Sequence, residues 1–267
     1  MNSTTSETIL QRLGNISRGR VAAARHRTSL DEIAEQARAR DCDTGFPFEK
    51  ALAADGMSFI CECKKASPSK GVISEDYPYL QIAHDYEDAG ADCISVLTEP
   101  TQFQGSDEHL RQIAETVSIP CLRKDFVVNE YQVYEAKLLG ASAVLLICSL
   151  LDTDKIRHCI EICDELGMTA VVEAHDANEI VSALDAGARV VGVNNRDLKD
   201  FSVNLDTSVN LRALVPNSTL YLAESGITSP EDVERLRDAN VDAVLVGETL
   251  MRAEDRKARL AQLRGEA

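Results

Sequence analysis

The sequence predicts an α/β protein that folds as a (β/α)8 barrel (a TIM barrel) preceded by an N-terminal helical extension. Eight short runs rich in apolar and β-branched residues recur along the chain, each followed by polar or glycine residues. Amphipathic segments lie between these runs, which gives eight β-α units of roughly 25 residues, a repeat that fits a closed barrel. No G-x-G-x-x-G turn follows an early run, whereas an open doubly wound sheet would favour one.

The eight runs are predicted as strands because both of their faces are apolar, as in a parallel sheet that helices cover. In chain order, the expected strands are Ser58–Cys63, Asp92–Leu97, Ile119–Arg123, Ala143–Cys148, Thr169–Ala174, Arg189–Asn194, Thr219–Glu224 and Asp242–Gly247. The expected helices are Tyr79–Ala89, Glu108–Thr116, Glu130–Leu139, Asp154–Leu166, Ala177–Ala186, Val209–Leu214, Pro230–Ala239 and Glu254–Arg264. Several end in a Gly-Ala pair, such as Gly90-Ala91, in which glycine relieves the left-handed cap conformation.

Residues 1–57 precede the first strand and form the helical extension. The predicted helices are about Glu7–Arg25, Ser29–Arg40 and Phe48–Ala54. Ser29 is a suitable N-cap, and Pro47 is typical of a helix start. The extension would either plug the bottom of the barrel or lie over its active face, and the sequence leaves both alternatives open. We expect residues 58–267 to form the barrel and the whole chain to be one domain.

The composition excludes several classes of function. A chain of 267 residues with 44% hydrophobic content can form one large α/β domain or two small ones. It has no run of about 18 apolar residues that would cross a membrane, and Met1–Glu7 lacks the apolar segment of a secretory signal. A net charge of −16 disfavours binding to nucleic acid, whose phosphates would be repelled. The same charge favours a monomer, with a dimer as the alternative.

The eight cysteines predict buried thiols rather than disulfides or a metal site. Five of them lie in or beside the strand runs, namely Cys61, Cys63, Cys93, Cys121 and Cys148. No C-x-x-C occurs, and no two histidines stand at a ligand spacing. Free thiols in a chain with no recognisable export signal predict a protein of the reducing cytoplasm.

Polar residues gather at the carboxyl ends of the predicted strands, where the chemistry of a (β/α)8 barrel takes place. The first strand contributes Glu62 and Lys64, which share a face because side chains alternate along a strand. The ends of later strands contribute Lys124, Glu173, Asn194, Arg196 and Glu224. Each residue alone could be a surface salt-bridge partner. Seven together predict one ring of functional side chains.

The loops after the last two strands predict a phosphate-binding site. Ser225-Gly226-Ile227 and Gly247-Glu248-Thr249 place glycines directly after these strands. Backbone N–H groups freed there, together with a short helix N-terminus, form a cradle for an anion at the position where such barrels commonly bind phosphate. Lys64, Lys124 and Arg196 can supply positive charge. We therefore expect a small phosphorylated substrate.

The ring favours general acid–base catalysis by a lysine and a glutamate, with nearby cations lowering the pKa of the lysine. A Schiff-base aldolase is the main alternative for an active-site lysine. Such barrels generally place that lysine on the sixth strand, where this chain has Asn194 and Asn195. An orotidine-type decarboxylase would need D-x-K-x-x-D, which Leu122–Val128 does not contain.

Eight motifs, in order along the chain, resemble those of the indole-3-glycerol phosphate synthase family. They are E-C-K-K-A-S-P-S-K-G (62–71), S-V-L-T-E (95–99), F-Q-G-S (103–106), L-R-K-D-F (122–126), V-E-A-H (172–175), G-V-N-N-R-D-L (192–198), E-S-G-I (224–227) and V-G-E-T-L-M (246–251). The match runs from about residue 7 to the last strand. The chain stops after one barrel, so it resembles the monofunctional enzyme.

This resemblance implies a carboxy-lyase of tryptophan biosynthesis. The family closes the ring of 1-(2-carboxyphenylamino)-1-deoxyribulose 5-phosphate with loss of CO2 and water, and the product is indole-3-glycerol phosphate. No metal and no organic cofactor is implied. Such a reaction needs a phosphate cradle, a group that holds the anthranilate carboxylate, an acid for the carbonyl oxygen, and an acid–base pair for dehydration.

The resemblance also implies roles for the residues of the ring. Lys124 matches the general acid that protonates the carbonyl oxygen, and Glu173 matches the general base of dehydration. Glu62 would orient Lys124 and a substrate hydroxyl, and Lys64 would bind an anionic group and donate the later proton. Asn194 would position substrate hydroxyls.

Further positions match substrate-binding residues of the family. Arg196, Leu198 and Glu224 would contact the substrate, and Phe126 would pack on its aromatic ring. The phosphate cradle would consist of Ser67, Ser225, Gly226, Gly247 and Glu248. Many relatives carry Ser at the position of Glu248, so only the backbone N–H of this residue is expected to bind phosphate.

Two other functions are compatible with the same residues. One is a related phosphate-binding barrel enzyme, such as an isomerase or synthase of the same pathway or of histidine synthesis. The other is a phosphate-binding scaffold without catalytic activity. The absorbance change that accompanies indole formation would separate all three.

Overall fold

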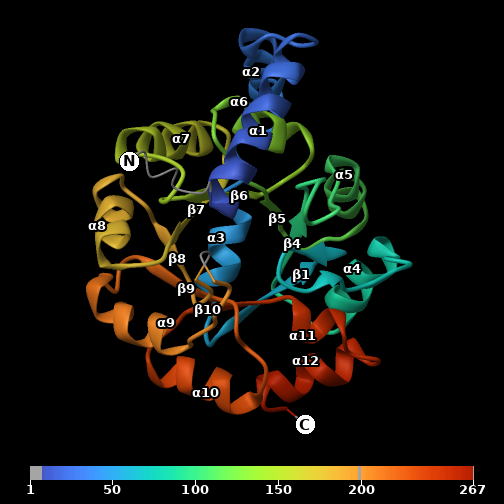
Figure 1. Ribbon diagram of the computed structural model, residues 1–267, viewed down its shortest axis with the longest axis vertical. Coiled ribbons are helices and arrows are strands. Elements are labelled where there is room, and N and C mark those ends of the chain that lie inside the picture. The colour runs from blue at the N-terminus through green and yellow to red at the C-terminus, as the bar shows by residue number, and fades with distance from the viewer. Residues whose placement is uncertain (1–7, 198–199, 267) are drawn as a thin grey trace, which may run out of the picture.

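Eight parallel strands close into a barrel in the computed structural model, which describes residues 8–197 and 200–266 (Figure 1). The barrel strands are β1 (Ser58–Cys63), β4 (Cys93–Leu97), β5 (Cys121–Lys124), β6 (Ala143–Ile147), β7 (Thr169–Ala174), β8 (Val190–Asn194), β9 (Leu220–Glu224) and β10 (Ala243–Val246). Each strand pairs with the next along the chain, and β1 closes the barrel by pairing with β10. The predicted (β/α)8 barrel is therefore confirmed.

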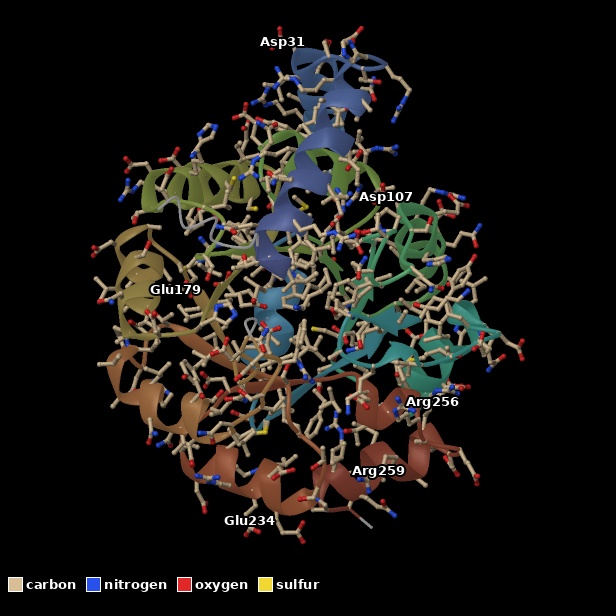
Figure 2. The ribbon with its side chains drawn as sticks, in the orientation of Figure 1. Asp31, Asp107, Glu179, Glu234, Arg256 and Arg259 are labelled. Atoms are coloured by element: carbon tan, nitrogen blue, oxygen red, sulfur yellow. The ribbon has the colours of Figure 1, made fainter. Side chains whose placement is uncertain are left out.

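Helices surround this barrel and connect its strands (Figure 1). They are α4 (Tyr79–Asp88), α5 (Asp107–Thr116), α6 (Tyr131–Leu138), α7 (Thr153–Glu165), α8 (Ala177–Asp185), α9 (Asp206–Leu211), the 3-10 turn η1 (Arg212–Leu214), α10 (Pro230–Asp238), α11 (Glu248–Met251) and α12 (Arg256–Arg264). Side chains of Asp152, Asp176 and Ser229 cap the starts of α7, α8 and α10 by accepting backbone N–H groups. Charged side chains such as Glu234 and Arg259 lie at the periphery (Figure 2).

The alternation of side chains along each strand decides what fills the barrel. Residues of one parity, such as Ile60, Leu122 and Leu222, belong to the inner apolar cluster, whereas their neighbours pack outward against the helices. Two residues farther along, the same parity gives Glu62, Lys124 and Glu224, respectively. The barrel interior therefore changes from apolar to charged at the carboxyl ends of the strands, where all three carboxyl or ammonium groups face the same space.

The N-terminal extension occupies both of the positions that the sequence left open. It contains α1 (Ile9–Arg25), α2 (Leu30–Arg38) and α3 (Pro47–Leu52). Phe48 and Leu52 of α3 are fully buried in the inner cluster at the amino-terminal end of the barrel. α2 lies against α6 and α7, where Arg38 contacts Glu165 at 2.6 Å. α1 then reaches the opposite, carboxyl end, where Leu10 and Leu13 line the cavity, so the extension contacts both ends of the barrel.

All eight cysteines are unpaired, and six of them are buried. Burial disfavours a thiolate, so it raises the pKa of Cys61, Cys63 and Cys121 above the ordinary thiol value. The prediction of buried free thiols is thus confirmed for these positions. Within the described part of the chain, no helix combines the length and the apolar character needed to cross a membrane.

Two small elements were not predicted from the sequence. β2 (Ala66–Ser67) and β3 (Gly71–Val72) form an antiparallel hairpin in the loop after β1, and α11 is a single turn after β10. Two-residue strands and one-turn helices carry too few residues for a periodic pattern. Both elements matter because residues of the hairpin and of α11 line the same cavity.

Candidate active site

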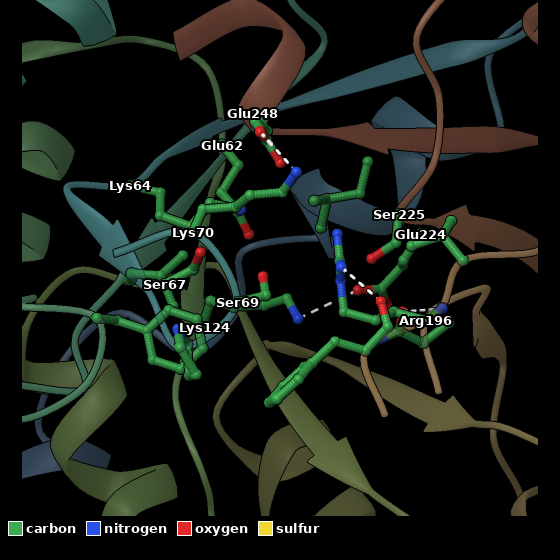
Figure 3. Close-up of a pocket in the computed structure, with 18 of the residues that line it drawn as sticks. Glu62, Lys64, Ser67, Ser69, Lys70, Lys124, Arg196, Glu224, Ser225 and Glu248 are labelled. Atoms are coloured by element: carbon green, nitrogen blue, oxygen red, sulfur yellow. Dashed lines mark hydrogen bonds and ion pairs between the residues drawn. The ribbon is translucent and has the colours of Figure 1, made fainter. Parts of the chain in front are cut away.

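A cavity of about 830 Å³ lies at the carboxyl ends of the barrel strands. Its lining contains every site residue predicted from the sequence that the structure describes: Glu62, Lys64, Ser67, Lys124, Phe126, Glu173, Asn194, Arg196, Glu224, Ser225, Gly226, Gly247 and Glu248. Leu198 lies outside the described residues. Residues predicted from separate motifs across the chain therefore meet in one space (Figure 3).

The ammonium of Lys124 lies between two buried carboxylates. Its Nζ is 3.1 Å from Oε2 of Glu224 and 3.4 Å from Oε2 of Glu173. Both glutamates are 2% exposed and the Lys124 side chain is 15% exposed, so water screens these charges weakly. Gly192 makes room for this arrangement, because a Cβ at that position would come within 2.6 Å of Oε1 of Glu224.

The surroundings of Lys124 keep it charged. Burial alone would favour the neutral amine, but the charges of Glu224, Glu173 and Glu62 outweigh burial and raise the pKa of Lys124 above its ordinary value. The sequence-based expectation of a lowered lysine pKa is therefore wrong at this position. Carboxylates, not cations, are the closest charged neighbours of this ammonium.

The pKa values of the two carboxyl groups beside Lys124 are shifted in opposite directions. Burial and the nearby charge of Glu173 raise the pKa of Glu224 to about 7, although Lys124 opposes this shift. Glu173 is equally buried, but the charges of Lys124 and His175, with a hydrogen bond from Asn194, hold its pKa below the ordinary value. Near neutral pH, Glu173 is therefore an ionised base and Glu224 exchanges a proton with its surroundings.

Glu62 and Lys64 form a pair of their own at the carboxyl end of β1. Lys64 Nζ donates a hydrogen bond to Oε2 of Glu62 at 2.5 Å. The hypothesis that Glu62 orients Lys124 is supported only by electrostatics. The charge of Glu62 raises the pKa of Lys124, but the Glu62 carboxylate accepts its hydrogen bond from Lys64. Lys64 therefore places one positive charge of the cavity at the carboxyl end of β1.

Asn194 and Arg196 are fixed by contacts within the segment after β8. Oδ1 of Asn194 accepts the backbone N–H of Arg196 at 3.0 Å. The Arg196 guanidinium donates to the carbonyl oxygen of Phe201 at 3.1 Å. Asn195, between them, is buried and donates to the carbonyl oxygen of Ser225 at 3.1 Å, which ties this segment to the loop after β9.

The loop after β9 has the backbone geometry of an anion-binding turn. Ser225 and Gly226 both have positive φ, at 67° and 83°. Glycine tolerates this left-handed conformation, whereas serine adopts it at a cost in strain. Consecutive residues with such dihedrals direct their N–H groups to one side, which favours an anion.

Basic side chains lie beside the loop after β10. The Glu248 carboxylate accepts a hydrogen bond from Nε of Arg252 at 3.0 Å and lies 3.6 Å from Nζ of Lys70. Figure 3 shows Lys70 extending from the hairpin region toward Glu248. Both cations line the cavity and were not predicted from the sequence. These contacts engage the Glu248 carboxylate, so this side chain is not itself a ligand for an anion.

Aromatic and apolar side chains form the remaining wall of the cavity. The rings of Phe103 and Phe126 lie 6.0 Å apart at an interplanar angle of 41°. Leu145 and Ile147 of β6 contribute inward-facing side chains. Phe126 was predicted, whereas Phe103 stood within a motif without being assigned a role. A flat hydrophobic ring of a ligand would fit against these surfaces.

α1 completes the cavity, a placement that the sequence left open. Leu10 and Leu13 line it, and the helix is fastened to the loop after β5. Oγ of Ser17 donates to the carbonyl oxygen of Phe126 at 2.6 Å. Arg20 donates to both carboxylate oxygens of Asp125 at 2.9 Å, a bidentate pair directly after Lys124 in the sequence.

His175 is a further residue that sequence reasoning did not assign, although it ended one of the motifs. It follows β7, and its Nε2 lies 3.4 Å from Oε1 of Glu173. Its Nδ1 lies 3.0 Å from Oε2 of Glu179, in α8. The described residues contain no cluster of three or more His, Cys, Asp or Glu side chains arranged to hold a metal ion.

Comparison with known sequences identifies the family. The indole-3-glycerol phosphate synthase family model matches residues 10–263. The indole-3-glycerol phosphate synthase of Ruminiclostridium cellulolyticum is 51% identical over 259 residues, which cover 97% of this chain and 100% of the relative. The enzyme of the same name from Endomicrobium trichonymphae is 44% identical over 96% of this chain and 99% of its own length.

The chain belongs to the indole-3-glycerol phosphate synthase family. It is accordingly a carboxy-lyase of tryptophan biosynthesis (EC 4.1.1.48). It converts 1-(2-carboxyphenylamino)-1-deoxyribulose 5-phosphate into indole-3-glycerol phosphate with loss of CO2 and water. The functional resemblance seen in the sequence is confirmed, and the related enzymes and the inactive scaffold considered beside it are set aside.

Solved structures of more distant proteins share the fold of this indole-3-glycerol phosphate synthase family member. The 3-hexulose-6-phosphate synthase of Salmonella typhimurium aligns with a TM-score of 0.65 at 16% identity, covering 79% of this chain and 98% of that one. Thiamine phosphate pyrophosphorylase from Pyrococcus furiosus aligns with a TM-score of 0.59 at 17% identity, over 82% of this chain and 96% of that one. At such identities the likeness concerns the barrel alone.

Proposed function

We propose that the cavity binds the anilino-ribulose phosphate with its ketone beside Lys124, and that Lys124 is the general acid of ring closure. The observation that carries this proposal is the position of the Lys124 ammonium, 3.1 and 3.4 Å from two carboxylates at the base of the cavity. As the ring carbon attacks, the carbonyl oxygen takes a proton from Lys124. A lysine kept charged by its neighbours also stabilises negative charge that develops on that oxygen.

Glu173 is proposed as the general base of dehydration. After the carbon–carbon bond forms, the carboxylate leaves as CO2 and its bonding electrons restore the aromatic ring. Glu173 then accepts a proton as the hydroxyl departs as water. Its lowered pKa supports this role, since a base must be ionised at the start of the step. Glu224, whose pKa is about 7, is proposed to donate a hydrogen bond to a substrate oxygen.

The polar rim is proposed to hold the two ends of the substrate. Lys64, kept in place by Glu62, binds an anionic group and donates the later proton. Asn194 positions a hydroxyl, and Arg196 pairs with the anthranilate carboxylate before it leaves as CO2. The aromatic ring of the substrate packs on Phe126.

The phosphate end is assigned to the loops after β9 and β10. Ser67 and the backbone N–H groups of Ser225, Gly226, Gly247 and Glu248 form the proposed cradle. The two consecutive positive φ values at residues 225 and 226 support this assignment. Lys70 and Arg252 add positive charge at the same end. Phosphate binding would therefore compete with Glu248 for these two cations.

We further propose that the chain functions as a monomeric single domain in the cytoplasm. Its exposed large hydrophobic side chains among the described residues are Val72, Val181, Val203 and Leu214, which come from separate segments. Eight unpaired cysteines favour a reducing compartment. Residues 58–267 would supply the barrel, and α3 and α1 of the N-terminal extension would pack at its amino-terminal and carboxyl ends, respectively. Light scattering of the purified protein would measure its mass in solution.

The assignment of Glu173 can be tested by following the loss of CO2 and the loss of water separately. In a single turnover, Glu173→Gln should still release CO2, while the indole absorbance should rise about 10²- to 10³-fold more slowly because the dehydration base is missing. The wild-type protein should show both signals together. Equal slowing of CO2 release and indole formation would move Glu173 to an earlier step. Unchanged indole formation would exclude it as the base.

A further inference from the structure

His175 stands between two carboxylates that belong to different elements. Its Nδ1 lies 3.0 Å from Oε2 of Glu179, and the same oxygen accepts the backbone N–H of His175 at 2.8 Å. Its Nε2 lies 3.4 Å from Oε1 of Glu173 and is buried, with no hydrogen-bond partner of proper geometry. The ring therefore points one nitrogen at Glu179 of α8 and the other at Glu173 of β7.

The contacts of the ring are those of an imidazolium. Nδ1 must carry a proton, because an ionised carboxylate accepts hydrogen bonds and donates none. Oε1 of Glu179 already accepts the hydroxyl of Ser149, and the amide of Glu179 bonds the Asp176 side chain, so Glu179 is held in place. In a neutral ring, Nε2 would then turn a lone pair toward Glu173. A proton on Nε2 removes that repulsion.

Glu173 consequently has a cation at each of its oxygens. Lys124 lies 3.4 Å from Oε2 and the His175 ring lies 3.4 Å from Oε1. Among the residues that the structure describes, only Lys124 lies within ion-pair distance of Glu224, which is equally buried, and none donates a hydrogen bond to its Oε1. This difference accounts for the opposite behaviour of two carboxyl groups that are equally buried around one lysine.

We propose that His175, anchored by Glu179, is a positioning residue that fixes the orientation of Glu173 and keeps it ionised as the base of dehydration. This inference rests on the role proposed above for Glu173. The charged groups that face His175 come from three elements: Glu173 on β7, Glu179 on α8 and Glu224 on β9. Burial disfavours the imidazolium, yet these carboxylates raise the pKa of His175 above its ordinary value.

The decisive experiment is the pH dependence of turnover in His175→Asn. Removing the positive charge at Oε1 raises the pKa of Glu173, so the acidic limb of the kcat profile should move to higher pH. At pH 5 we expect kcat to fall several-fold, with recovery above pH 7 and KM changed less than twofold. Glu179→Gln should shift the limb in the same direction by a smaller amount, because the ring keeps an acceptor but loses a neighbouring charge.

A matched control uses another histidine–glutamate pair, which lies outside the cavity. Nε2 of His158 lies 2.5 Å from Glu130 on the exposed side of α7, away from the cavity. His158→Asn should leave the pH profile unchanged. A lower unfolding temperature for His175→Asn with an unmoved acidic limb would overturn the proposal, since it would show a structural role only.

A second measurement does not depend on the stability of a His175 variant. In the NMR spectrum, the imidazole of His175 should titrate at lower pH in Glu173→Gln than in wild type, because one neighbouring carboxylate is gone. An unchanged titration would contradict the contact. If Glu173→Gln keeps normal indole formation, the assignment of Glu173 as the base fails. If Glu173→Gln is slow but the acidic limb of His175→Asn does not move, only the role proposed for His175 fails.

Discussion

The two ends of the barrel interior differ in their chemistry. At the amino-terminal end, Phe48 and Leu52 of α3 are fully buried against the inward-facing apolar residues of the strands. At the carboxyl end, two residues farther along each strand, the same inward positions carry Glu62, Lys124 and Glu224. One end is sealed by apolar packing, and the other is an open cavity of about 830 Å³.

This difference shows how a barrel can hold charges at one end. The carboxyl and ammonium groups of Glu62, Lys64, Lys124, Glu173 and Glu224, which line the cavity, each have a partner of opposite charge within about 3.5 Å. The apolar end supplies stability without such partners, since a buried aromatic side chain contributes a few kcal/mol. Stability and catalysis should therefore be separable by substitutions at opposite ends.

The largest effect is expected at the charged end. Lys124→Met removes the proposed acid while keeping a side chain of similar length, so kcat should fall by at least about 10³-fold. The circular dichroism spectrum and cooperative unfolding should be preserved, because the apolar end is untouched. Indole absorbance measures the turnover. Lys155→Met, which alters an exposed pair on α7, is the control and should keep normal activity. Near-normal turnover of Lys124→Met would refute the assignment.

The next effect is a loss of stability at the apolar end. Phe48→Ala should lower the free energy of unfolding by about 3–5 kcal/mol, because it leaves a cavity in a fully buried cluster. Urea unfolding measures this change, and KM should stay within a factor of two under native conditions. Phe103→Ala is the matched variant at the other end, where KM should rise and stability should change by less than about 2 kcal/mol. A reversed pattern would contradict the separation of the two ends.

The smallest effect concerns the pH dependence of stability. The folded pKa of Glu224 is about 7, above the ordinary value of 4.5. Between these values the folded chain holds a proton that the unfolded chain has released, so this carboxyl contributes stability at low pH that is lost as the pH rises through 7. Glu224→Gln cannot ionise and should be more stable than wild type above pH 7, by about 1–3 kcal/mol.

Urea unfolding at pH 5 and at pH 8.5 would measure this difference. The matched substitution Glu173→Gln should behave in the opposite way, because the folded pKa of Glu173 is lowered and its charge contributes stability above the ordinary carboxyl pKa. If both substitutions changed stability with the same sign at pH 8.5, the two carboxyl groups would not differ as the geometry indicates.

The sequence was sufficient to predict most of the barrel and of its polar ring. β1 and β7 coincide with their predicted ranges, and the other strands differ by one or two residues at their ends. Side-chain alternation then carries Glu62, Lys124 and Glu173 to the interior without further information. The motif resemblance added the roles of these residues, which alternation alone cannot provide.

Features that depend on contacts between distant segments were not predictable. Leu10 reaches the cavity only because Ser17 and Arg20 fasten α1 to the loop after β5, more than 100 residues away. The direction of the Lys124 pKa shift depends on which charges are closest. The sequence places both cations and carboxylates at the strand ends, so it does not show which of them lie nearest to Lys124. Pairing of His175 with Glu179 became apparent only from the distance between them.

The buried cysteines give this molecule an internal reporter of its own opening. Thiol reagents attack the thiolate, and burial suppresses that form at Cys61, Cys63 and Cys121 beneath the helices. These residues on β1 and β5 can react only after the barrel separates from its helical layer. The labelling rate at each sulfur would therefore time the opening of an individual strand, without a dye, an engineered probe or a denaturant.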